Sequence, residues 1–277
     1  MRFRKIYLEI SNLCNLRCAF CPGTRRPGRA MTEEDMALLL PKLRPYAEYL
    51  YFHLMGEPLL HPKLEAFLNM AGSAGFKVIL TTNGTLLEKR LDTLSQAGAL
   101  HKINISLHAF EANDLAVPFR DYLDGCFRFG KALEGRKIIA YRLWNNGGQN
   151  EKNEEILTAL KRYFPDPWVS ERRGTRIGER VYLEYGDKFD WPDLNAEDGG
   201  DSLFCYGLRD QIGVLCDGTV VPCCLDHEGD IALGNLFNQS MDEILSSPRA
   251  RALYDGFSNR KTTEALCRRC GYARRFG

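Results

Sequence analysis

Short apolar runs rich in β-branched residues alternate with stretches of helical periodicity between residues 5 and 172. Runs of this length, bounded by turn residues, are typical of buried strands, and their alternation with helices predicts parallel βα units. The predicted strands are IYLEI, LYFHL, KVILTT, KINISL, KIIAYRL and, last, WVSER. Because six units are too few for a closed eight-unit barrel, we expect an α/β fold with an open, partial (β/α)6 barrel whose ligands lie at the carboxyl ends of the strands.

Start and stop signals for helices fall between these predicted strands. Thr32 can cap the helix that follows it, whose first turn is acidic, and Pro62 suits the first turn of another. Gly75 and Gly98 each follow a helical stretch, where glycine commonly ends a helix. The predicted helices cover residues 33–45, 62–75, 86–97, 111–134 and 150–163.

The pattern changes after residue 172. A further strand-like run, RVYLEYG, leads into residues 187–202, whose content of Asp, Asn and Gly is typical of a linker. QIGVL and TVVPC, separated by Asp217 and Gly218, predict a β-hairpin, and Ser240 can cap a helix over 241–254. We therefore divide the chain into a barrel domain, 1–186, and a linker with a small hairpin-and-helix domain, 187–277.

The charge of the chain is nearly balanced, with 37 Lys and Arg residues against 36 Asp and Glu residues and a formal net charge of +1. Such a balance creates no long-range field toward nucleic acid, so a nucleic-acid partner is disfavoured. No apolar run approaches the roughly 20 residues that cross a bilayer, and the N-terminal sequence MRFRKIYLEI lacks the anatomy of a signal peptide. We expect a cytoplasmic protein with no membrane partner.

The chain contains ten cysteines, which need a chemical reason because a reducing compartment does not maintain structural disulfides. Three lie between residues 14 and 21, and six lie between residues 205 and 270. Cys126 stands alone in a helix-like stretch, where a small buried side chain is its simplest role. The grouping predicts two metal-binding regions.

The N-terminal group, Cys14, Cys18 and Cys21, forms a C-x3-C-x2-C pattern directly after the first predicted strand. Three thiolates are one fewer than a closed zinc or [4Fe–4S] site takes, so one iron of a cluster here would stay open to a small molecule. The competing interpretations are a zinc site completed by a histidine and three unrelated thiols. No histidine lies closer in sequence than His53, and we expect an open [4Fe–4S] cluster.

The segment CNLRCAFC, with the aromatic Phe20 before its last cysteine, resembles the signature of the radical SAM superfamily, whose members cleave S-adenosylmethionine (SAM) reductively. MGEP at 55–58 resembles the family's Gly-Gly-Glu motif, with Met55 in place of the first glycine. TTNG at 81–84 and ISLH at 105–108 resemble its later strand-end motifs. The resemblance implies a TIM-like partial barrel, a [4Fe–4S] cluster held by the three cysteines, and bound SAM.

The same resemblance and the strand-end positions name the residues expected at SAM. Arg142, at the end of the fifth predicted strand, is our candidate for the SAM carboxylate, because a guanidinium group pairs well with a carboxylate. The complete set is Phe20, Gly56, Glu57, Thr82, Asn83, Ser106 and Arg142.

Four cysteines of the C-terminal group can make a closed site, and zinc and a fully ligated [4Fe–4S] cluster both satisfy that number of thiolates. The run CYGLRDQIGVLCDGTVVPCC resembles the SPASM extension of radical SAM enzymes, or its shorter twitch form, which implies auxiliary clusters. Since only two cysteines follow Cys224, we expect one auxiliary [4Fe–4S] cluster. Neighbouring strand side chains point to opposite faces, so Cys223 and Cys224 are alternatives. The expected ligands are Cys205, Cys223, Cys267 and Cys270.

The resemblance implies that SAM is cleaved to a 5′-deoxyadenosyl radical that abstracts hydrogen from a substrate, with a flavodoxin- or ferredoxin-type electron donor. An auxiliary cluster offers an exit for a second electron, so we expect a two-electron oxidation, either a dehydrogenation or a crosslink. The substrate is expected to be a small molecule or a short peptide. Because the first predicted strand starts close to the first residue, we expect no leader-binding domain before it, which makes a peptide substrate less expected than a small molecule.

The catalytic residue itself remains open, and three side chains are candidates. Cys224 or Cys216 could return a hydrogen atom to a substrate radical, which makes a radical epimerase the alternative function. His108 lies two residues after Ser106 on the same face of the predicted strand, and could point into the site. A non-catalytic iron–sulfur or zinc protein is the remaining alternative. The other histidines, His53, His61, His101 and His227, show no partner pattern.

Overall fold

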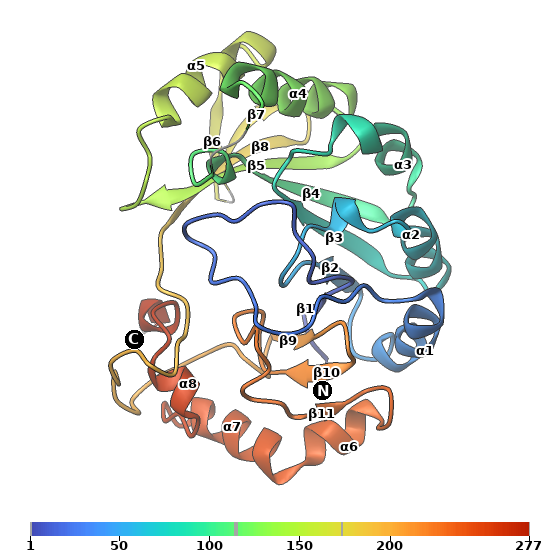
Figure 1. Cartoon of the computed structure of the whole chain (residues 1–277), viewed down its shortest axis with the longest axis vertical. Coiled ribbons are helices and arrows are strands. Elements are labelled where there is room, and N and C mark those ends of the chain that lie inside the picture. Colours follow the sequence, from blue (N-terminus) through green and yellow to red (C-terminus); the bar gives the residue numbers. More distant parts are fainter. Residues whose placement is uncertain (1, 114–115, 173, 277) are drawn as a thin grey trace.

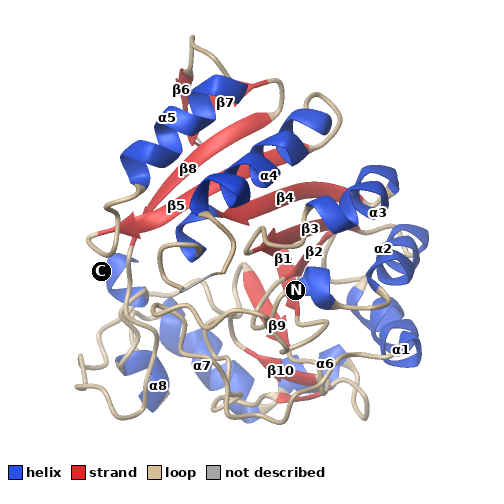
Figure 2. Ribbon diagram, turned by 45° about the horizontal axis from the view of Figure 1, so that its top comes forward, coloured by secondary structure: helices blue, strands red, loops and turns tan. Residues whose placement is uncertain are grey.

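The computed structural model describes residues 2–113, 116–172 and 174–276. They form one curved eleven-stranded sheet in the order β11-β10-β9-β1-β2-β3-β4-β5-β8-β7-β6, with helices α1 to α5 along its outer side (Figures 1 and 2). The strands are β1 (Lys5–Leu8), β2 (Tyr49–Phe52), β3 (Lys77–Thr82), β4 (Leu100–Ser106), β5 (Ile138–Asn146), β6 (Val169–Glu171), β7 (Gly174–Gly178), β8 (Val181–Asp187), β9 (Gln211–Val214), β10 (Thr219–Val221) and β11 (Gly234–Asn235).

Strands β1, β2, β3, β4, β5 and β8 pair in parallel, each with the next. The sheet does not close, because its terminal strands β11 and β6 lie at opposite ends of the strand order. The α/β fold with an open, partial (β/α)6 barrel is therefore confirmed.

The sixth parallel strand is not the one predicted, because WVSER contributes only the short β6, which pairs antiparallel with β7. All three residues of β6 are exposed, so this run has no buried face to place in the barrel wall. In β8, by contrast, Val181 and Leu183 are buried, and β8 pairs in parallel with β5. The connection to the sixth strand thus contains the helix α5 and a β-hairpin.

The predicted hairpin of the C-terminal domain is confirmed, since β9 and β10 pair antiparallel. Strand β9 also pairs in parallel with β1, from Lys5 opposite Gln211 to Leu8 opposite Val214. The hairpin thus extends the barrel wall past its first strand. The sheet is continuous across both parts of the chain, and the division at residue 186 stays a prediction.

The helices are α1 (Glu33–Leu43), α2 (Leu64–Ser73), α3 (Leu91–Gln96), α4 (Phe119–Ala132), α5 (Asn153–Tyr163), α6 (Met241–Ser246), α7 (Pro248–Ser258) and α8 (Ala265–Arg268). Helix α1 begins with a capping box in which Thr32 and Asp35 exchange hydrogen bonds, which satisfies amide groups that the first turn leaves unpaired. In the described residues no helix has both the length and the apolar character to cross a membrane.

Three helix predictions were wrong in extent. The helix expected over 86–97 begins as an α-helix only at Leu91, after the 3-10 turn Glu88–Arg90. The helix expected over 111–134 begins only at Phe119, after Pro118, and residues 114–115 of that prediction lie outside the described residues. The helix expected over 241–254 is broken into α6 and α7 at Ser247, because the proline ring of Pro248 disfavours helical backbone at the preceding residue. Ser247 then caps α7 by accepting a hydrogen bond from the amide of Ala250.

Side chains alternate between the two faces of the barrel strands, and the faces differ in chemistry. On β1, Ile6 and Leu8 pack in the main core, which lies under the helices. The intervening Tyr7 belongs to a second cluster on the inside of the barrel. We call this inside surface the inner face and the cluster the inner cluster, which consists of Tyr7, Leu54, Met55, Leu215 and Val221.

Candidate functional site

Residues 11–30 form a long loop between β1 and α1, here called the cysteine loop. Its two ends are joined by a β-bridge between Ser11 and Ala30. Asn12 holds the ends together, since its amide donates to the Arg29 carbonyl at 3.1 Å and its Oδ1 accepts from the Arg29 amide at 2.7 Å. The loop crosses the middle of the view in Figure 1, inside the curve of the sheet. A closed base allows the segment carrying the cysteines to keep one shape.

The three thiols of this loop meet N–H donors. The amide of Leu16 donates to Cys14 Sγ at 3.4 Å, and Asn113 Nδ2 donates to Cys18 Sγ at 3.0 Å. The surrounding loop partly desolvates the sulfur atoms, although Cys14 and Cys21 stay exposed as residues, and this desolvation raises the pKa of all three thiols, that of Cys18 to about 11. Metal binding must therefore displace protons, and the donors suit the sulfur atoms once they carry negative charge.

The donor set fits a cluster held from one loop. Among the described residues, no three His, Cys, Asp or Glu side chains form a compact set for a single metal ion. The thiolates of a [4Fe–4S] cluster each bind a different iron, so they need not converge on one point. Cys14 and Cys21 are exposed and Cys18 is half-buried, so all three can be reached.

Gly56 packs against the base of the cysteine loop at a distance that excludes every other residue. Its φ of +78° lies in the left-handed region, and a Cβ atom would stand 2.3 Å from the Ser11 carbonyl oxygen. The amide of the next residue, Glu57, donates to the Leu13 carbonyl at 2.8 Å. The MGEP segment therefore positions the loop through its backbone.

The carboxylate of Glu57 is buried, and both of its oxygen atoms accept hydrogen bonds from the protein itself. Its Oε1 accepts from the Leu59 amide at 3.0 Å and from the Thr82 hydroxyl at 2.8 Å, and its Oε2 accepts from the Asn83 amide at 2.7 Å. Burial nevertheless raises its pKa to about 7, because desolvation outweighs these three donors. Glu57 thus ties the end of β3 to the MGEP turn.

Asn83 connects the end of β3 to the cysteine loop. Its Nδ2 donates to Asn15 Oδ1 at 3.0 Å and lies 4.0 Å from Cys14 Sγ. Its carbonyl oxygen accepts from the hydroxyl of Tyr122 at 2.8 Å. The structure thereby brings Cys14, Glu57, Thr82 and Asn83 together, as their strand-end positions predicted, while their contact with SAM stays a prediction.

Replacement of Glu57 by alanine is expected to weaken SAM binding about tenfold or more while leaving the iron content unchanged. The change leaves the Thr82 hydroxyl and two amides without their charged acceptor, which shifts the strand end beside Cys14. Equilibrium binding of SAM to the anaerobically reconstituted protein measures the effect. Glu88→Ala is the matched control, since Glu88 is an exposed carboxylate paired with Arg128. Unaltered affinity in Glu57→Ala would count against this assignment.

Ser106 and Arg142 are opposite each other in the register of β4 and β5. Arg142 is not a free strand-end cation, because its Nε lies 3.2 Å from Glu184 Oε2 and its guanidinium lies 4.4 Å from the centre of the Trp144 ring. Glu184 also binds Lys102 at 2.6 Å. The assignment of Ser106 and Arg142 to SAM remains a prediction, and Arg142 keeps a carboxylate partner of its own.

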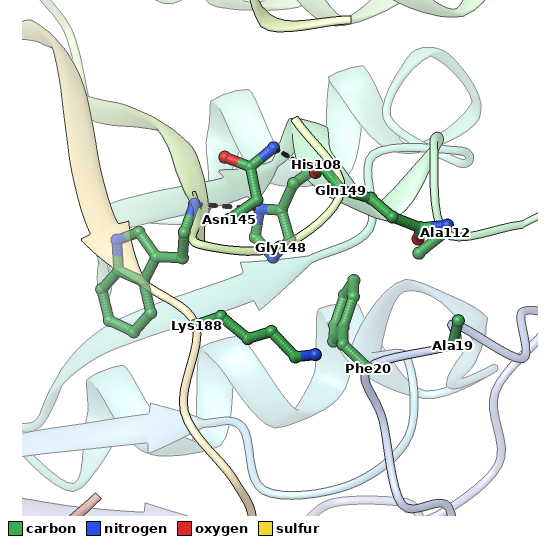
Figure 3. Close-up of a pocket in the computed structure, with 9 residues that line it drawn as sticks. Ala19, Phe20, His108, Ala112, Asn145, Gly148, Gln149 and Lys188 are labelled. Carbon is green, nitrogen blue, oxygen red and sulfur yellow. Dashed lines mark hydrogen bonds between the residues drawn. The ribbon is translucent and has the colours of Figure 1, made fainter. Parts of the chain in front are cut away.

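Phe20 and His108 line the same cavity of about 160 Å³, together with Asn145 and Lys188 (Figure 3). The two rings lie 4.9 Å apart. His108 is not on β4 as expected, because the strand ends at Ser106 and Leu107–Ala109 form a 3-10 turn. Its Nδ1 donates to the Arg142 carbonyl at 3.1 Å, and burial lowers its pKa to about 4, so the ring is neutral at physiological pH.

The four predicted auxiliary ligands lie within electrostatic reach of one another. Burial raises the pKa of Cys223, and so do the neighbouring thiols Cys224, Cys205 and Cys267. Burial, Cys205 and Cys270 likewise raise the pKa of Cys267. The four thiols are thus close enough to affect one another's charge, and Cys224 is close to them as well. Their role as ligands remains a prediction.

The side chain of Cys224 meets the inner face. It exchanges a hydrogen bond with the phenol of Tyr7 and packs beside the inner cluster. Cys216 is buried elsewhere, against an ion pair in which Arg26 lies 2.6 Å from Glu9, and its own amide donates to that carboxylate at 3.0 Å. Of the two candidate hydrogen donors, Cys224 therefore faces the barrel interior.

The sequence interpretation missed a group of residues on the inner face. The side chain of Lys5 lies over the rings of Tyr7 and Tyr51, at 5.2 and 5.7 Å from their centres. The His53 ring lies 5.9 Å from that of Tyr7, and burial, with the nearby Arg142 and Lys5, lowers its pKa to about 4. The sequence did contain an indication of this group. Polar and aromatic residues alternate with apolar ones along β1 and at the end of β2, and such alternation places them on one face of the sheet.

Comparison with known proteins decides the family. A sequence profile described as the radical SAM superfamily matches residues 8–170, more than half of the chain. The chain belongs to the radical SAM superfamily. A second profile, the SPASM iron–sulfur cluster-binding domain, matches residues 205–271. The protein is thus a radical SAM enzyme that uses a [4Fe–4S] cluster and SAM, and its SPASM domain carries an auxiliary cluster.

Two curated relatives show different chemistries within the superfamily. The chain is 38% identical to a GTP 3′,8-cyclase from Microcystis aeruginosa, with 90% of each protein covered. It is 35% identical to the S-adenosyl-L-methionine-dependent 2-deoxy-scyllo-inosamine dehydrogenase of Niallia circulans over 39% of this radical SAM protein and 46% of that enzyme. The match therefore spans less than half the length of the dehydrogenase.

Solved structures share the fold at low sequence identity. BtrN in complex with AdoMet and 2-DOIA superposes with a TM-score of 0.61 at 20% identity, covering 98% of this radical SAM protein and 94% of BtrN. Streptococcus suis SuiB bound to the precursor peptide SuiA has a TM-score of 0.65 at 17% identity, covering 98% and 70%. These likenesses support the partial barrel with its C-terminal extension.

Proposed function

We propose that this radical SAM enzyme catalyses a two-electron oxidation of a substrate held at the inner face of the barrel. The observation that carries the proposal is the pairing of β9 with β1, which makes the hairpin bearing Cys223 part of the barrel wall. Cys223 follows the last strand of this hairpin, and we propose that the cluster of Cys205, Cys223, Cys267 and Cys270 lies close to the barrel interior. An auxiliary cluster there is well placed to accept an electron from the substrate.

Cys14, Cys18 and Cys21 would hold the cluster, which together with bound SAM would supply the radical chemistry that removes one hydrogen atom from the substrate. Loss of a further proton and electron from the substrate completes the two-electron oxidation. Neutral His53 on the inner face can take the proton at its unprotonated ring nitrogen. The auxiliary cluster is proposed to take the electron, which a flavodoxin- or ferredoxin-type protein exchanges with the enzyme.

The SAM-binding part of the proposal rests on the contacts of the cysteine loop. The cavity between Phe20 and His108 has aromatic walls, which suit the adenine ring. Phe20 stands between Cys18 and Cys21 in the sequence, so this cavity is next to the cysteine segment. Glu57, Thr82 and Asn83 hold the β3 end against Cys14, and Gly56 lets backbone approach closely. These residues are proposed to position SAM over the cluster.

The substrate class is proposed to be a small molecule, with a short peptide as the second possibility. The 2-deoxy-scyllo-inosamine dehydrogenase among the relatives acts on a small molecule by its name, and SuiB binds a precursor peptide. Both proteins share the partial-barrel fold or part of the sequence with this chain. A dehydrogenation is favoured over a crosslink because it needs only one substrate position at the inner face.

A radical epimerase is the second candidate function, and one observation favours it. Cys224 faces the barrel interior, where its thiol exchanges a hydrogen bond with Tyr7. A thiol at that position could return a hydrogen atom to the substrate radical from the face opposite to abstraction. The two functions differ in whether the product has lost two hydrogens.

Deuterium transfer from candidate substrates into 5′-deoxyadenosine tests the proposed function. A panel of deuterated small molecules and short peptides is incubated with the reconstituted enzyme, SAM and dithionite. The product is then weighed with the unlabelled form of the active substrate. For an oxidation it is expected to weigh two mass units less than the substrate, with about one SAM consumed per product. Unchanged product mass, with solvent deuterium incorporated when the reaction is run in D₂O, would contradict the oxidation and support the epimerase.

A further inference from the structure

The inner face carries more positive than negative charge among the described residues. Lys102 and Arg142 share one carboxylate, that of Glu184, at 2.6 and 3.2 Å. The Glu9 carboxylate at the end of β1 is already neutralised by Arg26 at 2.6 Å. Lys102 and Arg142 thus both contact the same carboxylate, which lies on the inner face.

Lys5 adds a further positive charge. Its ammonium lies 5.2 Å from the ring centre of Tyr7 and 5.7 Å from that of Tyr51, so it stands over two aromatic faces. In the ranges that the structure describes, Lys5 forms no ion pair within 4.0 Å; Asp210 acts on its charge from farther away and is paired with Arg4. Burial lowers its pKa, and so does the nearby Arg142. A cation in such a place is costly to keep without a counter-ion.

Two neutral groups lie beside these cations and contribute no negative charge to the inner face. His53 is kept neutral by burial and by the same two cations, Arg142 and Lys5. Asn104, which is 1% exposed, donates its Nδ2 to Thr81 at 3.2 Å, while its Oδ1 has no hydrogen-bond partner. This buried acceptor is therefore available to a hydrogen-bond donor that is not part of the chain.

We propose that the inner face binds its substrate through an anionic group, a carboxylate or a phosphate, paired with Lys5. The rings of Tyr7 and Tyr51 flank this anchor, and Asn104 Oδ1 accepts a hydrogen bond from a hydroxyl or amine of the same substrate. This assignment rests on the proposed function, because it names the substrate class of that site. It requires no residue of the cysteine loop.

Another anion could neutralise Lys5, and the experiment must separate the two. Cys224 and Cys223 lie within electrostatic reach of Lys5, so an auxiliary cluster with four thiolates would be a negative neighbour. If Lys5 only balances the negative charge of that cluster, its removal changes the potential of the cluster and leaves the preference among substrates unchanged. If Lys5 holds the substrate, the preference for an anion is lost and the cluster is retained.

The test compares acids with their uncharged partners on the reconstituted full chain with SAM. The probes are N-acetyl amino acids against their carboxamides, small dicarboxylates against their diamides, and sugar phosphates against free sugars. The expected result is faster 5′-deoxyadenosine formation with members of the charged half only. Comparison of the carboxylate probes with the phosphate probes shows which of the two anionic groups the enzyme binds.

Lys5→Met removes the charge and keeps the length of the side chain. It is expected to raise the half-saturating concentration of the active acid about tenfold or more, with unchanged iron content and auxiliary-cluster potential. Arg4→Met is the matched control, because Arg4 is the adjacent cation and its side chain is 84% exposed. Equal responses to charged and neutral probes, no response to any probe, or a Lys5→Met variant that changes only the cluster potential would overturn the proposal.

The outcome for the proposed function is read separately. If an acid is preferred and Lys5→Met abolishes the preference, but the product is an isomer of the substrate, the anionic site stands and the oxidation fails. If a neutral compound is oxidised with loss of two hydrogens, the oxidation stands and the anionic site fails.

Discussion

The variant in which Cys14, Cys18 and Cys21 are all replaced by alanine is expected to contain about four irons per chain in place of about eight, and to form no 5′-deoxyadenosine. The three thiols lie on one loop that is closed at its base, and no other cysteine belongs to that loop. Their loss therefore removes one whole cluster and leaves the auxiliary one. Iron and sulfide analysis after anaerobic reconstitution, with product detection by chromatography, measures both effects.

Cys126→Ala is the matched control for the triple variant. Cys126 is buried in α4, where its Sγ lies 3.9 Å from the Gly84 carbonyl oxygen, and it belongs to neither group of candidate ligands. It should retain full iron and full SAM cleavage. A triple variant with full iron that still cleaves SAM in the presence of dithionite would refute the assignment of the SAM-binding cluster.

The neighbouring cysteines of the hairpin are expected to give opposite results. Cys223→Ala should lose about half of the iron, because its thiol lies among Cys205, Cys267 and the other auxiliary candidates. Cys224→Ala should keep the iron, because its thiol is bonded to Tyr7 on the inner face. SAM cleavage without substrate should survive both changes, since that step needs only the N-terminal cluster.

Turnover of the substrate then separates the two candidate reactions. An oxidation should stop in Cys223→Ala, which lacks the electron acceptor, and continue in Cys224→Ala. An epimerisation should stop in Cys224→Ala and tolerate the loss of auxiliary iron better. Loss of iron in Cys224→Ala together with full iron in Cys223→Ala would show that the ligand has been assigned to the wrong neighbour.

Local chemistry made much of the candidate site predictable. The spacing of Cys14, Cys18 and Cys21 and the strand-end positions of Glu57 and Asn83 were sufficient to expect one site, because parallel strands bring their carboxyl ends to one edge. The structure brings these groups together through hydrogen bonds such as that from the Asn83 amide to Glu57. Short-range signals such as the capping box at Thr32 were equally reliable.

Several assignments failed where one local pattern fits two structures. WVSER and RVYLEYG both have strand-like composition, and only the burial of Val181 and Leu183 decides which one enters the barrel wall. His108 was expected on the strand, but the chain turns after Ser106 into a 3-10 segment. Arg142, whose contact with SAM stays a prediction, also pairs with Glu184, 42 residues later, and no local pattern indicates that pair.

The sequence by itself determined the superfamily, the two groups of cysteines and the order of the first five strands of the barrel, because these depend on residue type and on spacing within short segments. Only the tertiary structure decided that β9 joins β1, that Cys224 faces inward, and that Lys5 shares the inner face with Tyr51, His53 and Arg142. Such pairings join residues more than 40 positions apart. Their free energy comes from packing and charge across the folded barrel, which no local pattern records.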